Sequence, residues 1–297
     1  MHSHPVTSTS SCGGNLPLAS RPVYVVTDAA VDLPANSTHH LPIEVLPITV
    51  SFGSRSILHG REPDLETFYR LLRESRHFPT TAAPTPAHTA ERYAALLDQG
   101  YDILSLHLAS SFSTTALQCA RLAEELDSRR IAVVDSGQMS AGLGLMVVTC
   151  ARAAAAGEPL ARLEQMARAM VPRVRLAGAL QSLDHVRRSG RVPGLPAAVG
   201  EFLHIKPLFE VYRGQVTLLG FSRTVRQATR RLVELVRKWG PIQEMAVIHA
   251  DNAGWASELV ESLAEFLPSI PTIMDAGPTI VSHVGPGAVG VAALLAN

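Results

Sequence analysis

Hydroxyl-bearing side chains gather in two short segments of the chain, PTTAAPT (79–85) and ASSFSTT (109–115). The second segment follows a strand that we expect to end near Leu108. In open parallel sheets ligands bind at the carboxyl ends of the strands, and a helix that begins there offers unpaired N–H groups and a positive dipole to an anion. Ser and Thr are also ordinary N-caps, so the sequence leaves both interpretations open. The same holds for DSGQMSAGLG (135–144), in which Ser136 or Ser140 can simply start a helix.

One histidine, His283, lies in a C-terminal run that contains no charged residue from Ala276 to Asn297. Two prolines and several glycines interrupt this run, whereas a membrane span needs about 20 continuous apolar residues. The run therefore belongs to the interior of a soluble fold. A histidine placed there is either a satisfied core residue or the polar head of an otherwise apolar site.

GPGAVG (285–290) matches the dinucleotide fingerprint G-x-G-x-x-G. Only seven residues follow it, so no following strand can supply the acidic residue that binds ribose, and we exclude a nucleotide site. Gly285 and Gly287 instead predict unusual backbone dihedrals or a close approach of the chain to a neighbour.

A Ser-His-Asp hydrolase can be imagined from Ser113, His283 and Asp28. The chain has neither the G-x-S-x-G elbow of such enzymes nor the G-x-x-x-x-G-K-[ST] phosphate loop, which argues against both classes.

Cys12, Cys119 and Cys150 are far apart and in no C-x-x-C spacing, which indicates neither a disulfide framework nor a zinc site. We expect no metal, and a reducing cytoplasm as the location. Residues 1–21 are rich in Ser and Thr, lack the features of a secretory signal, and are expected to form a disordered tail.

The charges balance, with 26 Lys and Arg against 26 Asp and Glu, and no block of like charge tracks a phosphate backbone. Nucleic acid is therefore not expected as a partner. A length of 297 residues suggests two domains.

Hydrophobic patterns predict an α/β fold. Strands are expected over 23–27, 44–52, 101–108 and 131–135, and helices over 64–75, 87–100, 113–126, 142–156 and 160–171. This alternation predicts a parallel sheet covered on both faces, in a first domain of residues 22–160. Beyond it we expect a strand over 175–183, a basic connection over 185–196, a hairpin turning at Arg213 and Gly214, a helix over 224–239, a strand over 244–250, a helix over 255–267 and a strand over 271–276. Residues 161–297 would thus form a second, α+β domain.

Nine short motifs follow one another from about Val23 to the C-terminus. They are TDAAVDLP (27–34), EVLPITVSF (44–52), PTTAAPT, HLASSFSTT (107–115), VVDSGQMSAGLG (133–144), RRSGRV (187–192), IKPLFEV (205–211), SRT (222–224) and HVGPGAVG (283–290). Their ordered succession resembles the DegV family, which contains the fatty-acid-binding subunits of bacterial fatty acid kinase.

The resemblance implies two domains that enclose a long apolar tunnel for an acyl chain, with the C-terminal segment contributing to the ligand site. It also implies a partner kinase, related to dihydroxyacetone kinases, that phosphorylates the bound fatty acid. The chain itself would be a carrier with no cofactor, not an enzyme. Transient contact with a membrane surface would load it, with Arg187, Arg188 and Arg191 touching anionic lipid or the partner, although a solvated loop explains these arginines equally well.

Carried over by position, Thr81, Ser113 and His283 match the family residues that hydrogen-bond the carboxylate. Arg223 matches an arginine near the head group or the kinase surface. Thr114 stands where the family has glycine, and Ala82 stands where the family has serine, so the geometry around the head group is expected to differ.

A buried carboxylate needs two to four hydrogen bonds, some of them charge-assisted, and two hydroxyls with an imidazole N–H suffice. Each buried CH₂ contributes about 0.8 kcal/mol, so an acyl chain of about sixteen carbons supplies on the order of 10 kcal/mol before ordering costs. The alternative function is an enzyme or sensor acting on another apolar carboxylate, with Ser113 as nucleophile.

Overall fold

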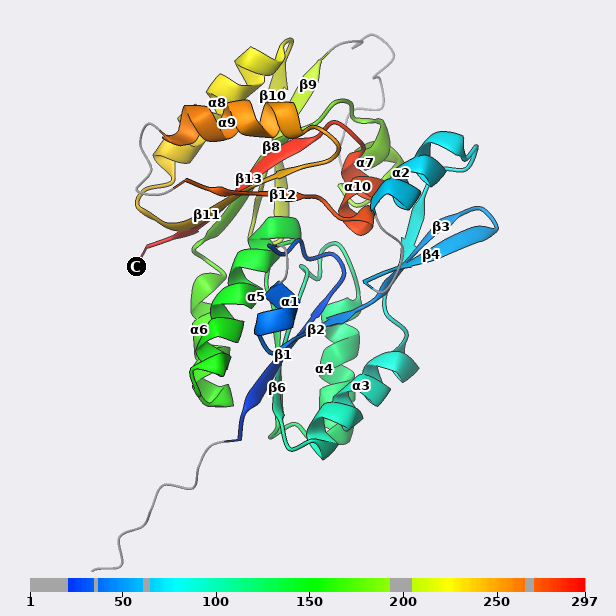
Figure 1. Cartoon of the computed structure of the whole chain (residues 1–297), viewed down its shortest axis with the longest axis vertical. Coiled ribbons are helices and arrows are strands. Elements are labelled where there is room, and N and C mark those ends of the chain that lie inside the picture. Colours follow the sequence, from blue (N-terminus) through cyan, green and yellow to red (C-terminus); the bar gives the residue numbers. More distant parts are fainter. Residues whose placement is uncertain (1–20, 35–36, 61–64, 193–204, 265–269, 297) are drawn as a thin grey trace, which may run out of the picture.

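The computed structural model describes residues 21–34, 37–60, 65–192, 205–264 and 270–296. Its first sheet is parallel, with strands in the order β2-β1-β6-β7 (Figure 1). These strands are β1 (Val23–Asp28), β2 (Ile43–Leu46), β6 (Asp102–His107) and β7 (Ile131–Asp135). The predicted alternation of strands and helices in this part of the chain is confirmed. The expected tail over 1–21 lies, apart from Arg21, outside the described residues.

The second sheet has six strands in the order β10-β9-β8-β13-β11-β12. They are β8 (Val174–Ala179), β9 (Lys206–Tyr212), β10 (Gln215–Ser222), β11 (Ile242–His249), β12 (Thr272–Asp275) and β13 (Val289–Leu295). β13 pairs antiparallel with both β8 and β11, so the end of the chain forms an interior strand of this sheet. This position explains why the C-terminal run carries no charge.

A third, three-stranded sheet joins β3 (Ile48–Phe52) with β4 (Arg55–His59) and β5 (Thr80–Ala82). The single strand expected over 44–52 is wrong, because β2 and β3 belong to different sheets and Pro47 lies between them. Proline has no N–H to donate to a strand ladder, so the chain leaves the first sheet at this residue.

Ten helices are assigned in the described part of the chain. They are α1 (Ser37–His40), α2 (Leu65–Glu74), α3 (Pro86–Asp98), α4 (Thr115–Leu126), α5 (Ser140–Ala155), α6 (Leu160–Met170), α7 (Asp184–Ser189), α8 (Val225–Lys238), α9 (Ala253–Ala264) and α10 (Pro278–Val284). The connection expected over 185–196 is wrong in its first part, which forms α7 and ends at Gly190 in the left-handed region. Its part from 193 onward lies outside the described residues. The hairpin at Arg213 and Gly214 is confirmed, and both residues have positive φ, of 50° and 77°.

Helix α5 lies between the two larger sheets and packs against β1 on one side and β8, β11 and β13 on the other (Figure 1). Its sequence, SAGLGLMVVTCARAAA, is apolar on nearly every face, as a helix buried on all sides requires. The next helix, α6, packs against β6 and β7 of the first sheet. We therefore propose that the chain divides after Met170, at the end of α6, and not before it.

Asp32 links three segments at the junction of the two larger sheets. Its Oδ2 accepts a hydrogen bond of 2.5 Å from the Ser140 hydroxyl at the start of α5, and its Oδ1 accepts one of 2.7 Å from the N–H of Gly277, just before α10. Burial raises the pKa of Asp32 to about 6, against the lowering effect of these two hydrogen bonds.

The Asp32→Asn variant is expected to gain stability relative to the wild type as the pH rises from about 4 to about 6. The folded wild type keeps a proton on Asp32 in this range, whereas the unfolded chain, with the ordinary pKa of 3.8, has lost it. The free energy of unfolding of the wild type therefore falls as the pH rises through the window, by up to about 3 kcal/mol from this group, and the neutral amide has no such dependence. Urea unfolding at a series of pH values measures the difference, with Asp98→Asn at an exposed site as the control. Parallel pH profiles for wild type and Asp32→Asn would contradict the expectation.

Candidate ligand-binding site

A cavity of about 310 Å³ lies between the carboxyl-terminal end of the first sheet and the elements of the second. Its wall is mainly apolar. The apolar lining includes Ala30, Ile48, Leu108, Phe112, Met139, Leu180, Leu183, Phe209, Val211 and Ile280. The polar side chains in the wall are Thr81, Ser113, Thr114, Ser189, Arg191, Thr279 and His283. A mainly apolar cavity with a few polar groups in its wall is typical of sites for amphipathic small molecules.

Thr81 and His283 meet at this wall although 202 positions separate them in the chain. Thr81 lies on the short strand β5, and His283 lies near the end of α10. The Oγ1 atom of Thr81 is 2.9 Å from the Nε2 atom of His283. The packing of α10 against β3 and β5 brings the two segments together.

His283 is neutral near pH 7, because burial, together with the charges of Arg191 and His185, lowers its pKa to about 4. Its buried Nδ1 has no hydrogen-bond partner among the described residues. When Nε2–H donates to the Thr81 oxygen, the hydroxyl hydrogen of Thr81 is free to donate to a ligand in the cavity. His283 in this tautomer holds Thr81 as a donor for an anion.

Ser113 lies in the segment between β6 and α4. Its hydroxyl is 2.8 Å from the Oγ1 of Thr115 and accepts a 3.3 Å hydrogen bond from the N–H of Thr115. Ser113 thus supports the start of α4 and at the same time lines the cavity. Thr114 is the N-cap residue of α4, makes no side-chain cap bond, and also lines the cavity.

Ala82 also lines the cavity, whereas Arg223, Gly285, Gly287, Ser136 and Ser140 lie outside its wall. Arg223 is exposed just beyond β10, where its N–H donates to Gln227. Gly285 and Gly287 have φ values of 81° and 80°, which confirms the unusual backbone dihedrals predicted at these positions. A Cβ on Gly285 would come within 2.8 Å of the His185 ring, so the chain does make a close approach here. Ser140 begins α5, whereas Ser136 forms a local turn with Gln138.

Sequence reasoning missed the place of Arg191 in the cavity wall. Its Nη1 donates a 2.6 Å hydrogen bond to the carbonyl of Ser189, and its charge lowers the pKa of His283. RRSGRV contains three arginines, and nothing in their spacing distinguishes the one that lines a cavity. Thr279 was missed as well, and its hydroxyl already bonds the Nδ1 of His59 at 2.7 Å.

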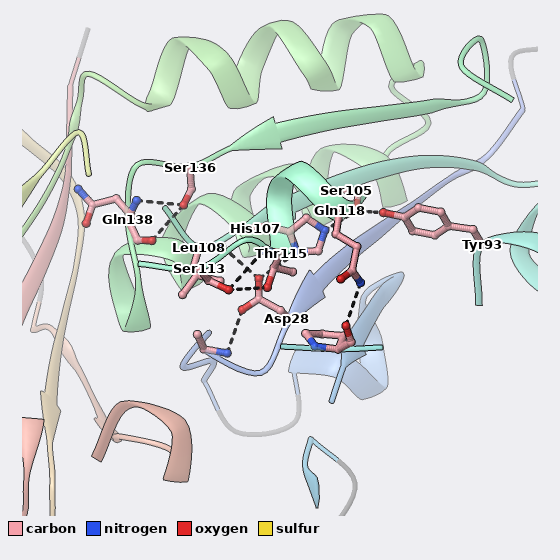
Figure 2. Close-up of polar contacts among 12 residues, drawn as sticks. Asp28, Tyr93, Ser105, His107, Leu108, Ser113, Thr115, Gln118, Ser136 and Gln138 are labelled. Carbon is pink, nitrogen blue, oxygen red and sulfur yellow. Dashed lines mark hydrogen bonds and ion pairs between the residues drawn. The ribbon is translucent and has the colours of Figure 1, made fainter. Parts of the chain in front are cut away.

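The imagined hydrolase triad is not formed. Asp28 is fully buried, and its carboxylate bonds the ring of His107 and the N–H groups of Ala30 and Leu108 (Figure 2). The Nε2 of His283 bonds Thr81, so Ser113 has no general base in the arrangement that the sequence suggested.

Within the described ranges, no group of three or more His, Cys, Asp or Glu side chains is placed to hold a metal ion. None of the described helices is long and apolar enough to cross a bilayer.

Solved structures of similar proteins share this architecture. A fatty-acid-binding DegV family protein from Streptococcus agalactiae superposes with a TM-score of 0.85 at 25% identity, covering 94% of this chain and 100% of that one. A DegV family protein from Thermus thermophilus, described by its fatty acid binding, superposes with a TM-score of 0.82 at 27% identity, covering 93% of this chain and 100% of that one.

The sequence comparisons point to the same family. A DegV domain-containing protein of Mycobacterium tuberculosis is 34% identical over 275 residues, which cover 91% of this chain and 96% of the relative. Another, of Streptomyces coelicolor, is 31% identical over 277 residues, which cover 92% of this chain and 98% of the relative. The family model described as an uncharacterised protein of the DegV family matches residues 22–296. This chain therefore belongs to the DegV family.

Proposed function

We propose that the chain binds a long-chain fatty acid, with the acyl tail in the cavity and the carboxylate at Thr81 and Ser113. The observation that carries the proposal is that one mainly apolar cavity contains Thr81, Ser113 and His283 together in its wall. The Streptococcus agalactiae and Thermus thermophilus proteins, which have the same fold, are described as binding fatty acids, and this supports the ligand class.

The polar wall suits a carboxylate better than a neutral head group. Thr81 and Ser113 supply hydroxyl donors, and neutral His283 orients the hydroxyl of Thr81. Arg191 supplies a positive charge in the wall that attracts an anion. Hydrogen bonds to an ionised group are roughly twice as strong as those between neutral groups, so these residues would select acids over alcohols and esters.

Within this proposal the chain presents the carboxylate to a separate kinase of the dihydroxyacetone-kinase class, which forms the acyl phosphate. Transient contact with a membrane surface would supply the fatty acid. Formation of acyl phosphate from ATP only when such a kinase and the loaded chain are combined would support this step.

Native mass spectrometry of the freshly purified protein tests the ligand directly. A stoichiometric bound mass, identified as a fatty acid after solvent extraction, is the expected result. A protein that carries no ligand and takes up no added fatty acid would overturn the proposal. A covalent acyl-serine at Ser113 would instead support the enzyme alternative.

A further inference from the structure

Four fully buried polar side chains form a continuous series of contacts in the first domain (Figure 2). The hydroxyl of Tyr93 on α3 is 2.5 Å from the Oγ of Ser105, and this Oγ is 2.6 Å from the Nε2 of His107. The Nδ1 of His107 is 2.9 Å from the Oδ2 of Asp28. Burial by itself lowers the pKa of His107, but the Cys119 sulfur and the Asp28 carboxylate outweigh it and raise the pKa to about 10. His107 is therefore an imidazolium that donates from both ring nitrogens, to Ser105 and to Asp28.

Ser105, His107 and Asp28 have the connectivity of a catalytic triad, but they do not form an active site. Ser105 is 0% exposed, is already in contact with Tyr93, and is not part of the cavity wall. A substrate has no access to its hydroxyl. Burying an ion pair has a desolvation cost that a pair of apolar side chains would not have. Stability alone therefore does not explain why these two side chains are buried here.

The remaining hydrogen bonds of Asp28 are to backbone groups of two residues in the cavity wall. Its Oδ1 accepts a 3.1 Å hydrogen bond from the N–H of Ala30, and its Oδ2 accepts a 3.1 Å hydrogen bond from the N–H of Leu108. Ala30 and Leu108 both line the cavity. Leu108 is also the first residue after β6 and opens the segment that leads to Ser113 and Thr114.

We propose that Asp28 is a positioning residue for the head-group site, because its carboxylate holds the backbone of Ala30 and Leu108 at the cavity wall and so fixes the segment that carries Ser113. This inference rests on the proposed binding of a fatty acid carboxylate. The 2.9 Å contact with the His107 ring holds the Asp28 carboxylate in place, and neither side chain is part of the cavity wall. A separate contact joins α4, which follows Ser113 and Thr114, to the segment that follows β5, since the Nε2 of Gln118 donates a 2.8 Å hydrogen bond to the carbonyl of Pro84.

The Asp28→Asn variant tests the proposal through a comparison of two ligands, palmitic acid and hexadecanol, in a fluorescence displacement assay. Asparagine has one acceptor oxygen in place of two, and its amide nitrogen only donates, so it cannot accept from Ala30, Leu108 and His107 together. The backbone at the cavity wall therefore loses part of its fixed position. The affinity for palmitic acid is expected to fall at least about tenfold, whereas that for hexadecanol, which depends on the tail, changes less than about twofold. Asp102→Asn is the matched control, because it breaks the ion pair with Arg130 (3.0 Å) at the start of β6, at the opposite end of that strand from His107, and should leave the preference for the acid unchanged.

An equal loss of affinity for the two ligands, or no loss for either, would overturn the proposal, since a merely structural aspartate does not distinguish between them. Should Asp28→Asn not fold, His107→Gln keeps both backbone contacts of Asp28 but removes the imidazolium. It is expected to show a smaller loss that is again confined to the acid, and an equal effect on the two ligands would overturn the proposal. A wild type that binds neither ligand would overturn the proposed function itself, and this inference with it.

Discussion

Replacing Ser113 and His283 together by alanine is expected to lower the affinity for a long-chain fatty acid by at least about 100-fold. Each hydrogen bond to a charged group contributes about 1.5 to 3 kcal/mol. The double variant removes the hydroxyl donor of Ser113 and leaves Thr81 without the ring that orients it at 2.9 Å. The carboxylate would then be buried with few partners, which is more costly than losing the contacts alone.

Displacement of a fluorescent fatty acid at neutral pH measures this loss. Ser110→Ala serves as a control because Ser110 is exposed, lies three positions from Ser113, and does not line the cavity. His283 acts through Thr81, so the losses from Thr81→Ala and His283→Ala should not add in the variant that carries both. Unchanged affinity in the Ser113→Ala/His283→Ala variant would show that the carboxylate binds elsewhere.

The affinity for saturated fatty acids is expected to rise about fourfold with each added CH₂ until the cavity is full, and then to level off. Each methylene that leaves water contributes about 0.8 kcal/mol, and the wall offers it mainly apolar side chains. Across several methylenes this effect exceeds that of any single polar contact. Calorimetric titration with acids of increasing length measures the slope and the length at which it breaks.

The Phe209→Ala variant is expected to move this break to longer chains. Phe209 lies on β9, is half-buried, and contributes its ring to the cavity wall, so its removal adds room for the tail. Phe221→Ala is the matched control, because Phe221 is 39% exposed on β10 and lies outside the wall. If the affinity of both variants levels off at the chain length found for the wild type, the acyl tail does not pass Phe209.

Most of the regular structure followed from local patterns. The strand predicted over 131–135 has these bounds in the structure, and the hairpin at Arg213 and Gly214 turns where predicted. The parallel first sheet followed from the alternation of strands and helices, since parallel strands need such crossovers. These features depend on residues close together in the chain, which a single sequence displays.

Features that depend on contacts between residues far apart in the chain were harder to predict from the sequence. The sequence predicted one strand over 44–52, and only the structure assigns the residues on the two sides of Pro47 to different sheets. α7 was missed because its six residues, DHVRRS, carry no apolar period. The strand β13 was missed because a central strand, buried on both faces, reads as a continuous apolar run and not as an alternation.

For the candidate site, too, the sequence predicted some features and only the structure showed the others. Thr81, Ser113 and His283 were named from motifs, and the uncharged run around His283 marked it as interior. That Thr81 and His283 share a hydrogen bond, and that Arg191 lines the same cavity, depends on the packing of α10 and of the segment after α7. The partner of Asp28 was likewise decided by tertiary structure, which pairs it with His107 across two neighbouring strands and not with His283. The sequence by itself determined the residue types and the local elements, because these follow from short-range sterics and hydrophobic period. Only the tertiary structure decided which polar groups meet, because a buried polar group is satisfied by whichever partner the packing brings within about 3 Å.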